Sequence, residues 1–132
     1  MFQEFEQEMT EELVRDIPLR SLALLGDAVF ELFERERQLL GTATTSRLHE
    51  KVVSRVNAAA QAALLDSLAD ADMFTEKEAD LIRRARNLKP TVSRKSAQLS
   101  YRKSTAFEAL IGYLYLRDRQ RLKEILDFTV EG

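Results

Sequence analysis

The fold of this chain is set by one apolar segment, Arg20-Ser21-Leu22-Ala23-Leu24-Leu25-Gly26-Asp27-Ala28-Val29-Phe30-Glu31-Leu32-Phe33. The pattern is typical of a nearly all-apolar helix with one carboxylate and one glycine in its middle, and such a helix is usually covered by protein on most sides. A buried Asp27 would cost about 2–7 kcal/mol, or more if ionised, unless it is paired or bound to a metal ion. Gly26 adds about 0.5–1 kcal/mol of helix penalty relative to alanine. The two residues are therefore a candidate site, with an aspartate pointing out of a narrow solvent-facing stripe as the alternative.

A second segment, Phe107-Glu108-Ala109-Leu110-Ile111-Gly112-Tyr113-Leu114-Tyr115-Leu116, repeats this pattern. Glu108 and Gly112 are four positions apart and share one helix face. Two buried helices that each carry a small residue and an acid can cross closely and direct both acids to one point. Either one acid is then protonated or a cation lies between them. Because all the ligands are oxygens, Mg²⁺ is the expected ion.

The composition indicates one all-helical domain. A chain of 132 residues can build a proper core, and Leu plus Ala (35 residues) outnumber Val plus Ile (11). The absence of cysteine excludes disulfides and a thiol nucleophile and suits a reducing cytoplasm. Neither a signal peptide nor a membrane-spanning run is evident. We therefore expect a cytoplasmic protein that does not contact a membrane.

Charge is strongly segregated along the chain. The net charge is −2, yet residues 81–107 contain no Asp or Glu. A basic segment in an otherwise acidic protein indicates a polyanion partner, although solvated charge runs are also common. The basic residues of this segment, which we take as candidate nucleic-acid contacts, are Arg83, Arg84, Arg86, Lys89, Arg94, Lys95, Arg102 and Lys103.

Apolar periodicity and helix-capping residues predict the order of elements. Residues 1–16 form an acidic N-terminal segment and residues 17–132 form the domain. Helices are expected over 10–15, 18–40, 46–56, 58–68, 75–87, 101–117 and 118–130, and residues 89–100 are expected to form a polar, basic loop. His49, the single histidine, is interpreted as a structural hydrogen-bonding residue, with acid–base catalysis or substrate contact as the alternative. Four polar residues are interpreted as surface residues that could extend a phosphate-binding face: Lys51, Ser54, Arg55 and Gln61.

With these features in view, the chain resembles the RNase III catalytic domain, and more closely the compact Mini-ribonuclease III group. The resemblance depends on Leu25-Gly26-Asp27-Ala28-Val29, which is similar to the signature helix of the family, and on Phe107-Glu108-Ala109-Leu110-Ile111-Gly112, which is similar to its second catalytic motif. Three further segments look specifically like the Mini form: Tyr101-Arg102-Lys103-Ser104-Thr105-Ala106-Phe107-Glu108, Arg84-Ala85-Arg86-Asn87 and Leu48-His49. The similarity covers about residues 17–130.

The resemblance implies the RNase III endonuclease-domain fold and a homodimer that cleaves double-stranded RNA with Mg²⁺, leaving 5′-phosphate and 3′-hydroxyl ends. Asp27 and Glu108 match the metal-binding acids of the family and are the expected catalytic residues. Family analogy further suggests maturation of the 23S ribosomal RNA precursor, with a ribosomal protein as an additional partner. The alternative is a non-catalytic RNA-binding or ribosome-associated helical protein on the same fold.

The sequence also departs from the full-length enzymes of the family. Arg20, Ala23 and Thr105 stand where those enzymes carry further acids, so water and phosphate oxygens must complete the Mg²⁺ coordination. Ser104 or Thr105 could hold a metal-bound water or simply start a helix. Glu31 could support the site one turn after Asp27 or face solvent. No double-stranded-RNA-binding domain follows in this sequence, so residues 83–103 are expected to grip the duplex by shape, across its minor groove.

Overall fold

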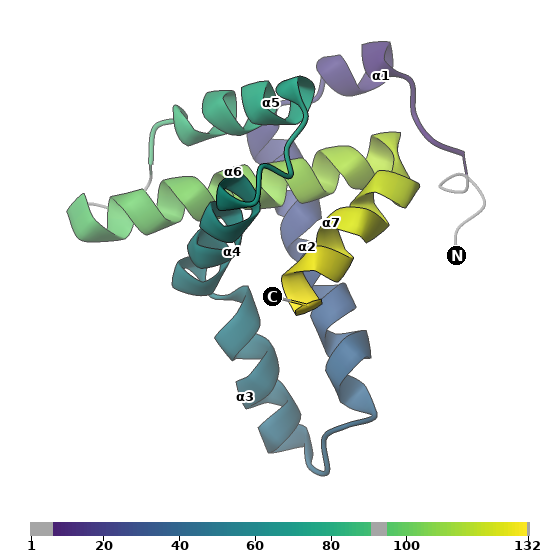
Figure 1. Cartoon of the computed structure of the whole chain (residues 1–132), viewed down its shortest axis with the longest axis vertical. Coiled ribbons are helices and arrows are strands. Elements are labelled where there is room, and N and C mark those ends of the chain that lie inside the picture. The colour runs from purple at the N-terminus through teal and green to yellow at the C-terminus, as the bar shows by residue number, and fades with distance from the viewer. Residues whose placement is uncertain (1–6, 91–94, 132) are drawn as a thin grey trace.

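The structure is a computed structural model that describes residues 7–90 and 95–131, with the side chains of 95–97 left out. In these ranges the backbone forms helices joined by short connections, and no strand occurs (Figure 1). The helices are α1 (Glu11–Arg15), α2 (Leu19–Leu39), α3 (Thr45–Val56), α4 (Ala58–Asp70), α5 (Glu76–Arg86), α6 (Lys95–Arg117) and α7 (Arg119–Glu131). The all-helical prediction is confirmed.

Helix α6 is the centre of the molecule (Figure 1). Its middle is the most apolar part of the core, where Phe107, Leu110 and Ile111 are completely buried. Helix α2 crosses α6 in the most extensive helix–helix contact of the described chain, and α4 and α5 pack on other sides of α6. Phe30 of α2 meets Phe107 edge-on, with ring centroids 5.0 Å apart, a favourable geometry for aromatic pairs.

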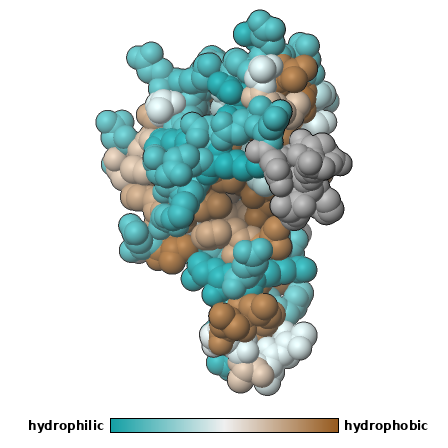
Figure 2. Space-filling view, turned by 90° about the vertical axis from the view of Figure 1, so that its right-hand side faces the viewer, coloured by the Kyte–Doolittle hydropathy of each residue, from teal (hydrophilic) through white to brown (hydrophobic). Residues whose placement is uncertain are grey.

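The second half of α2 leaves the body of the molecule and pairs with α3 as a projecting arm (Figure 1). Val52 of α3 is buried against it. Asn57 divides α3 from α4, because its backbone N–H closes α3 on Val53 while its side chain accepts a hydrogen bond from the N–H of Ala60. Apolar surface is visible near the free end of the arm (Figure 2), where α2 ends at the exposed Leu39 and Leu40.

A buried charge cluster closes the base of the arm. Glu34 of α2 is completely buried and accepts hydrogen bonds from Arg37 (2.6 Å), Gln38 (2.9 Å) and Arg55 of α3 (3.2 Å). Arg55 also donates to the carbonyl of Thr129 and thereby ties α3 to α7. Burial acts to raise the pKa of Glu34, but the Arg37 hydrogen bond and the Arg55 charge outweigh it and hold the pKa below its usual value. The interpretation of Arg55 as a surface residue was therefore wrong.

The basic loop expected over residues 89–100 is shorter than predicted, because α6 begins at Lys95. The first turns of α6 contain no glycine or proline. Their polar composition favoured a loop prediction, but they form the end of a helix that extends beyond the apolar core. Arg102 holds this end to α5 by donating to the carbonyl of Arg86 (3.1 Å). Part of the predicted loop, residues 91–94, lies outside the described residues. Helix α5 begins with a capping box formed by Thr75 and Glu78.

The described part of the acidic N-terminal segment packs against the far end of α6. The N–H of Met9 donates to the carbonyl of Leu116 (2.7 Å). Glu11 accepts hydrogen bonds from Tyr113 (2.8 Å) and Arg117 (2.9 Å), and Val14 is buried. Among the helices of residues 7–90 and 95–131, none combines the length and apolar character that crossing a bilayer requires.

Candidate active site

Two glycines allow α2 and α6 to touch backbone to backbone. A Cβ atom on Gly26 would overlap the carbonyl group of Glu108, and a Cβ atom on Gly112 would overlap the carbonyl group of Leu22. Any side chain at either position would therefore push the two helices apart. The close crossing predicted from the two glycines is present, and it places Asp27 directly after one contact residue and Glu108 opposite it.

Asp27 and Glu108 line one open cleft of about 250 Å³. The other residues of the cleft come from the same two helices: Arg20, Ala23 and Leu24 from α2, and Tyr101, Ser104 and Thr105 from α6. Asp27 is exposed at the cleft, whereas Glu108 is largely buried. Of the two alternatives that the sequence left open, buried or solvent-facing, Asp27 takes the solvent-facing one, because no described residue covers this side of α2 and even the apolar Leu24 is 74% exposed there.

The two acids are close enough to perturb each other. The pKa of Glu108 is raised to about 8, first by burial and then by a hydrogen bond with Asp27 and repulsion from its charge. Glu108 is therefore mostly protonated at neutral pH in the absence of a cation. A cation placed between the two carboxylates would remove this repulsion and favour the ionised form of both.

The donors present suit a hard divalent cation such as Mg²⁺. Asp27 and Glu108 offer carboxylate oxygens, and the described part of the chain contains no cluster of three or more Asp, Glu, His or Cys that could enclose an ion. Two protein ligands leave most positions of an octahedral ion to water and to phosphate oxygens, an arrangement that Mg²⁺ commonly adopts. The residues therefore fit a cation that is bound jointly by protein and substrate.

The other residues predicted for the site are Ser104, Thr105 and Glu31, and only the first two line the cleft. Ser104 and Thr105 are buried and line the cleft, and the Ser104 hydroxyl donates to the side-chain carbonyl of Gln61. Glu31 does not line the cleft and instead pairs with Arg35 (2.9 Å).

Gln61 was missed, because it was interpreted as a surface residue. It is 1% exposed and lies on α4, which packs against α6, the helix that carries Glu108. One signal could have revealed it, since Gln61, Leu65 and Leu68 have the i, i+4, i+7 spacing of a buried helix face. His49 lines a different pocket, with Arg35, Thr45, Leu48 and Val52.

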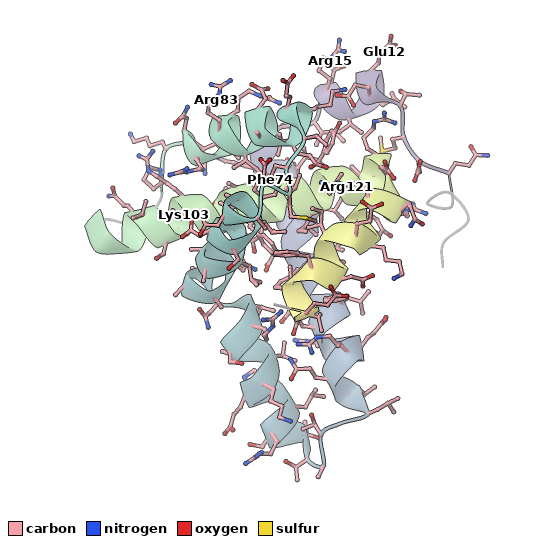
Figure 3. The ribbon with its side chains drawn as sticks, in the orientation of Figure 1. Glu12, Arg15, Phe74, Arg83, Lys103 and Arg121 are labelled. Atoms are coloured by element: carbon pink, nitrogen blue, oxygen red, sulfur yellow. The ribbon has the colours of Figure 1, made fainter. Side chains whose placement is uncertain are left out.

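The predicted RNA-contacting residues are not gathered at the acid cleft. Arg83, Arg86 and Arg102 line a separate cavity of about 390 Å³ between α4, α5 and α6, which shares no residue with the cleft. Arg83 projects from α5, whereas Lys103 lies where α6 meets α4 (Figure 3) and pairs with Asp66 (3.0 Å).

Other basic residues are nearer to the acids or are paired. Arg20, which lines the cleft, donates to the carbonyl of Lys89 and so holds the end of the α5–α6 connection beside the cleft. Arg84 shares Asp80 with Arg83 in exposed ion pairs. Arg94 and the side chain of Lys95 lie outside the described residues.

Comparison with known proteins agrees with this architecture. The sequence profile of the ribonuclease III domain matches residues 20–119. The chain is 48% identical over 118 residues to the Mini-ribonuclease 3 of Gloeobacter violaceus, covering 89% of this chain and 86% of that protein. It is 47% identical over 123 residues to the Mini-ribonuclease 3 of Symbiobacterium thermophilum, covering 88% and 93% respectively. A crystal structure of a protein from Fusobacterium nucleatum is similar in fold, with a TM-score of 0.79 and 31% identity over 90% of this chain and 96% of that one.

Proposed function

This chain belongs to the Mini-ribonuclease 3 family of ribonuclease III-class endoribonucleases, and from that membership we propose that it hydrolyses phosphodiester bonds of double-stranded RNA with Mg²⁺. The products are 5′-phosphate and 3′-hydroxyl ends. The observation that supports this chemistry is the convergence of Asp27 and Glu108 on one cleft, with a raised pKa on Glu108. A non-catalytic RNA-binding protein, the alternative from the sequence, would gain nothing from two adjacent acids that repel each other.

In this proposal Asp27 and Glu108 are the ligands of the cation. Bound Mg²⁺ would supply a Lewis acid that activates water and offsets the charge developing on the scissile phosphate. The two carboxylates fix where the phosphate sits, because the crossing at Gly26 and Gly112 fixes the helices that carry them. Glu108 must release its proton before it can bind a cation, so cation affinity should increase with pH up to about 8.

The hydroxyl of Thr105 is the stronger candidate for holding a water beside the carboxylates. It lines the cleft, whereas the hydroxyl of Ser104 is already donated to Gln61 and the carboxylate of Glu31 is used by Arg35. We assign no direct role in the reaction to Glu31. His49, which lines another pocket, is likewise not assigned to the chemistry.

Duplex binding is proposed to depend on the basic residues of segment 83–103. Arg83, Arg84 and Lys103 are partly neutralised by Asp80 and Asp66. The three remaining basic residues with described side chains form no ion pair within residues 7–90 and 95–131, so they can turn to phosphates with less competition: Arg86, Lys89 and Arg102. Contacts of this kind recognise the shape and charge of a duplex rather than its sequence.

A homodimer is also proposed, since each subunit would then cut one strand. The exposed leucine beside the acids supports this, because Leu24 lines the cleft yet is 74% exposed. Covering such apolar side chains is a common reason for self-association. Sedimentation at micromolar concentration should give a dimer for the native chain and a monomer for Leu24→Arg; a native monomer would contradict the proposal.

The natural substrate is proposed to be a precursor of 23S ribosomal RNA, processed in the cytoplasm with a ribosomal protein assisting. This part of the proposal depends on the family likeness alone. It predicts cleavage at defined positions in a transcript that carries the paired ends of the 23S precursor. Uncut precursor, in a preparation that cuts other duplexes, would refute it.

The central experiment incubates the purified protein with a long RNA duplex and sizes the products. Cleavage is expected with Mg²⁺ and should be lost on adding EDTA. Single-stranded RNA and double-stranded DNA of the same sequence are the matched controls and should stay intact. A preparation that leaves the RNA duplex intact in Mg²⁺, or that cuts equally well in EDTA, would refute the proposed function.

A further inference from the structure

Gln61 is an unusual residue for its position. It is the only polar residue among the first eight positions of α4, AAAQAALL, and its side chain is inside the protein. It lies where α4 packs on α6, next to Ser104, which lines the acid cleft. An apolar residue of the same length, such as methionine, would fill this space without needing hydrogen bonds.

The two ends of the Gln61 amide differ in their hydrogen bonding. The carbonyl Oε1 accepts a hydrogen bond from the Ser104 hydroxyl. The amide nitrogen Nε2 is buried and makes no hydrogen bond with good geometry in the described structure. A buried donor without a partner costs about 1–3 kcal/mol, and such groups are rare unless they serve a purpose.

The Glu108 carboxyl is a neighbour of this amide. A side-chain contact with Gln61 lowers the pKa of Glu108, while burial and Asp27 raise it. Ser104 and Glu108 are four positions apart on α6 and share one face, so one amide can bridge them. Glu108 therefore has two polar neighbours, the exposed Asp27 and the buried amide of Gln61.

We propose that Gln61 is a positioning residue for Glu108: Ser104 fixes the carbonyl end of the amide, so that its N–H group holds the Glu108 carboxylate in the orientation that binds the cation. This inference depends on the proposed function, because it assumes that Glu108 is a cation ligand. The carboxylate has two oxygens, and the hydrogen bond occupies the one that faces the interior. The other oxygen is then directed into the cleft, towards Asp27. Residues that orient metal ligands in this way commonly affect metal affinity 10–100-fold.

The same geometry gives Ser104 a role that differs from holding water in the cleft. Its hydroxyl proton is donated to Gln61, so Ser104 acts on Glu108 only through the amide. Removing Ser104 should release the amide and weaken cation binding less than removing the amide itself.

The test measures cation binding directly, with Mn²⁺ as the probe and the loss of its free-ion paramagnetic resonance signal as the readout. Gln61→Met keeps the side-chain length and removes both hydrogen-bonding groups. It should bind Mn²⁺ about tenfold more weakly than the native chain, with unchanged affinity for an RNA duplex in EDTA. Thr129→Val is the control, because it removes a buried hydroxyl on α7, far along the chain from the cleft residues, and should leave Mn²⁺ affinity unchanged.

Ser104→Ala provides a second variant that keeps Gln61 and does not depend on how well Gln61→Met folds. It should weaken Mn²⁺ binding by a smaller factor, and the double variant should bind no more weakly than Gln61→Met, because residues that act as a unit do not contribute additively. Native Mn²⁺ affinity in Gln61→Met would overturn the proposal. Effects that multiply in the double variant would overturn the assignment of Ser104.

Asp27→Asn and Glu108→Gln belong in the same titration, because they separate this proposal from the one before it. If both bind Mn²⁺ as well as the native chain, the proposed function fails and the role of Gln61 fails with it. If both lose binding while Gln61→Met does not, only the role of Gln61 fails.

Discussion

Helix α2 contributes one carboxylate to each of two clusters. The neighbouring residues balance the negative charge in one cluster and add to it in the other. At the base of the arm Glu34 is completely buried, yet Arg37, Gln38 and Arg55 satisfy it. At the crossing with α6, seven residues earlier on the same helix, Asp27 meets a second acid, Glu108, and among the described residues no arginine forms an ion pair with either. The first cluster lowers the pKa of its glutamate and the second raises it.

The comparison shows that burial alone does not identify a functional acid. Glu34 is the more deeply buried glutamate, but arginines of the protein balance its negative charge, so it needs no bound cation. Glu108 is less buried but carries an uncompensated charge when ionised, so its site is complete only with a cation. The distinguishing feature is the sign of the nearest charged neighbour.

The sharpest way to test this difference is to neutralise the acids of each cluster. Asp27→Asn and Glu108→Gln should each lower the rate of duplex cleavage about 1,000-fold or more, because each removes a proposed ligand of the cation, an effect of about 4 kcal/mol on the barrier. Glu36→Gln, at an exposed position of α2, is the matched control and should cleave at the native rate. If either acid variant cleaved RNA within tenfold of the native rate, the two clusters would not differ in function as proposed.

Glu34→Ala should instead act on stability. It leaves Arg37 and Arg55 without their buried partner, so the free energy of unfolding should fall by about 3–4 kcal/mol. Urea denaturation measures this change, and the folded fraction at low urea should retain native cleavage activity. If the variant were as stable as the native chain but inactive, Glu34 would belong to the functional cluster.

Gly26→Ala tests the crossing of α2 and α6, which brings Asp27 and Glu108 together. The added Cβ meets the carbonyl of Glu108, which is main chain and cannot rotate away, so α2 and α6 must move apart. We expect a loss of about 2–3 kcal/mol in the free energy of unfolding, together with weaker cation binding. Gly41→Ala is the matched control, because its Cβ would meet nothing within 4 Å and should cost no stability.

The smallest expected effect is the change in the free energy of unfolding with pH. The folded-state pKa of Glu108, about 8, lies above its ordinary value of 4.5, so the folded protein retains a proton that the unfolded chain releases. In EDTA, stability should therefore fall as pH rises from about 5 to 8, by about 1–3 kcal/mol after allowance for the open cleft. The pKa of Glu34 is lowered, so its contribution is present above pH 4.5 and is lost in acid.

Urea denaturation at several pH values measures this slope. Glu108→Gln should abolish the fall between pH 5 and 8, whereas Glu36→Gln should leave it unchanged. Saturating Mg²⁺ should also flatten the curve of the native chain, since the cation displaces the proton. An identical slope in Glu108→Gln would mean that another group carries the proton.

The sequence predicted what depends on local spacing. Gly26 lies next to Asp27, and Glu108 lies one turn from Gly112, so both pairs could be read from residue order and helical geometry. The all-helical fold followed from composition, and the order of the helices followed from apolar periodicity and breaks in it. Each of these inferences needed only neighbouring residues.

The sequence could not predict what depends on contacts between distant segments. Gln61 is buried because α4 packs against α6, and its partner is forty-three positions away. Asp27 is exposed because none of the described residues covers its side of α2, which an apolar pattern does not reveal. The early start of α6 at Lys95 depends on its contact with α5. Tertiary packing decided these three cases against local pattern.

The contact between the main chains of Gly26 and Gly112 also determines how this protein can change without losing its chemistry. No side chain intervenes between the two helices there, so at this point their separation is set by main-chain contact. Conservative substitutions at Leu68 of α4 or Ile125 of α7 should alter melting temperature while leaving this contact in place. The interior away from the crossing can therefore change in sequence, and a protein engineer could rebuild it for heat resistance while keeping the two glycines and the cleft residues.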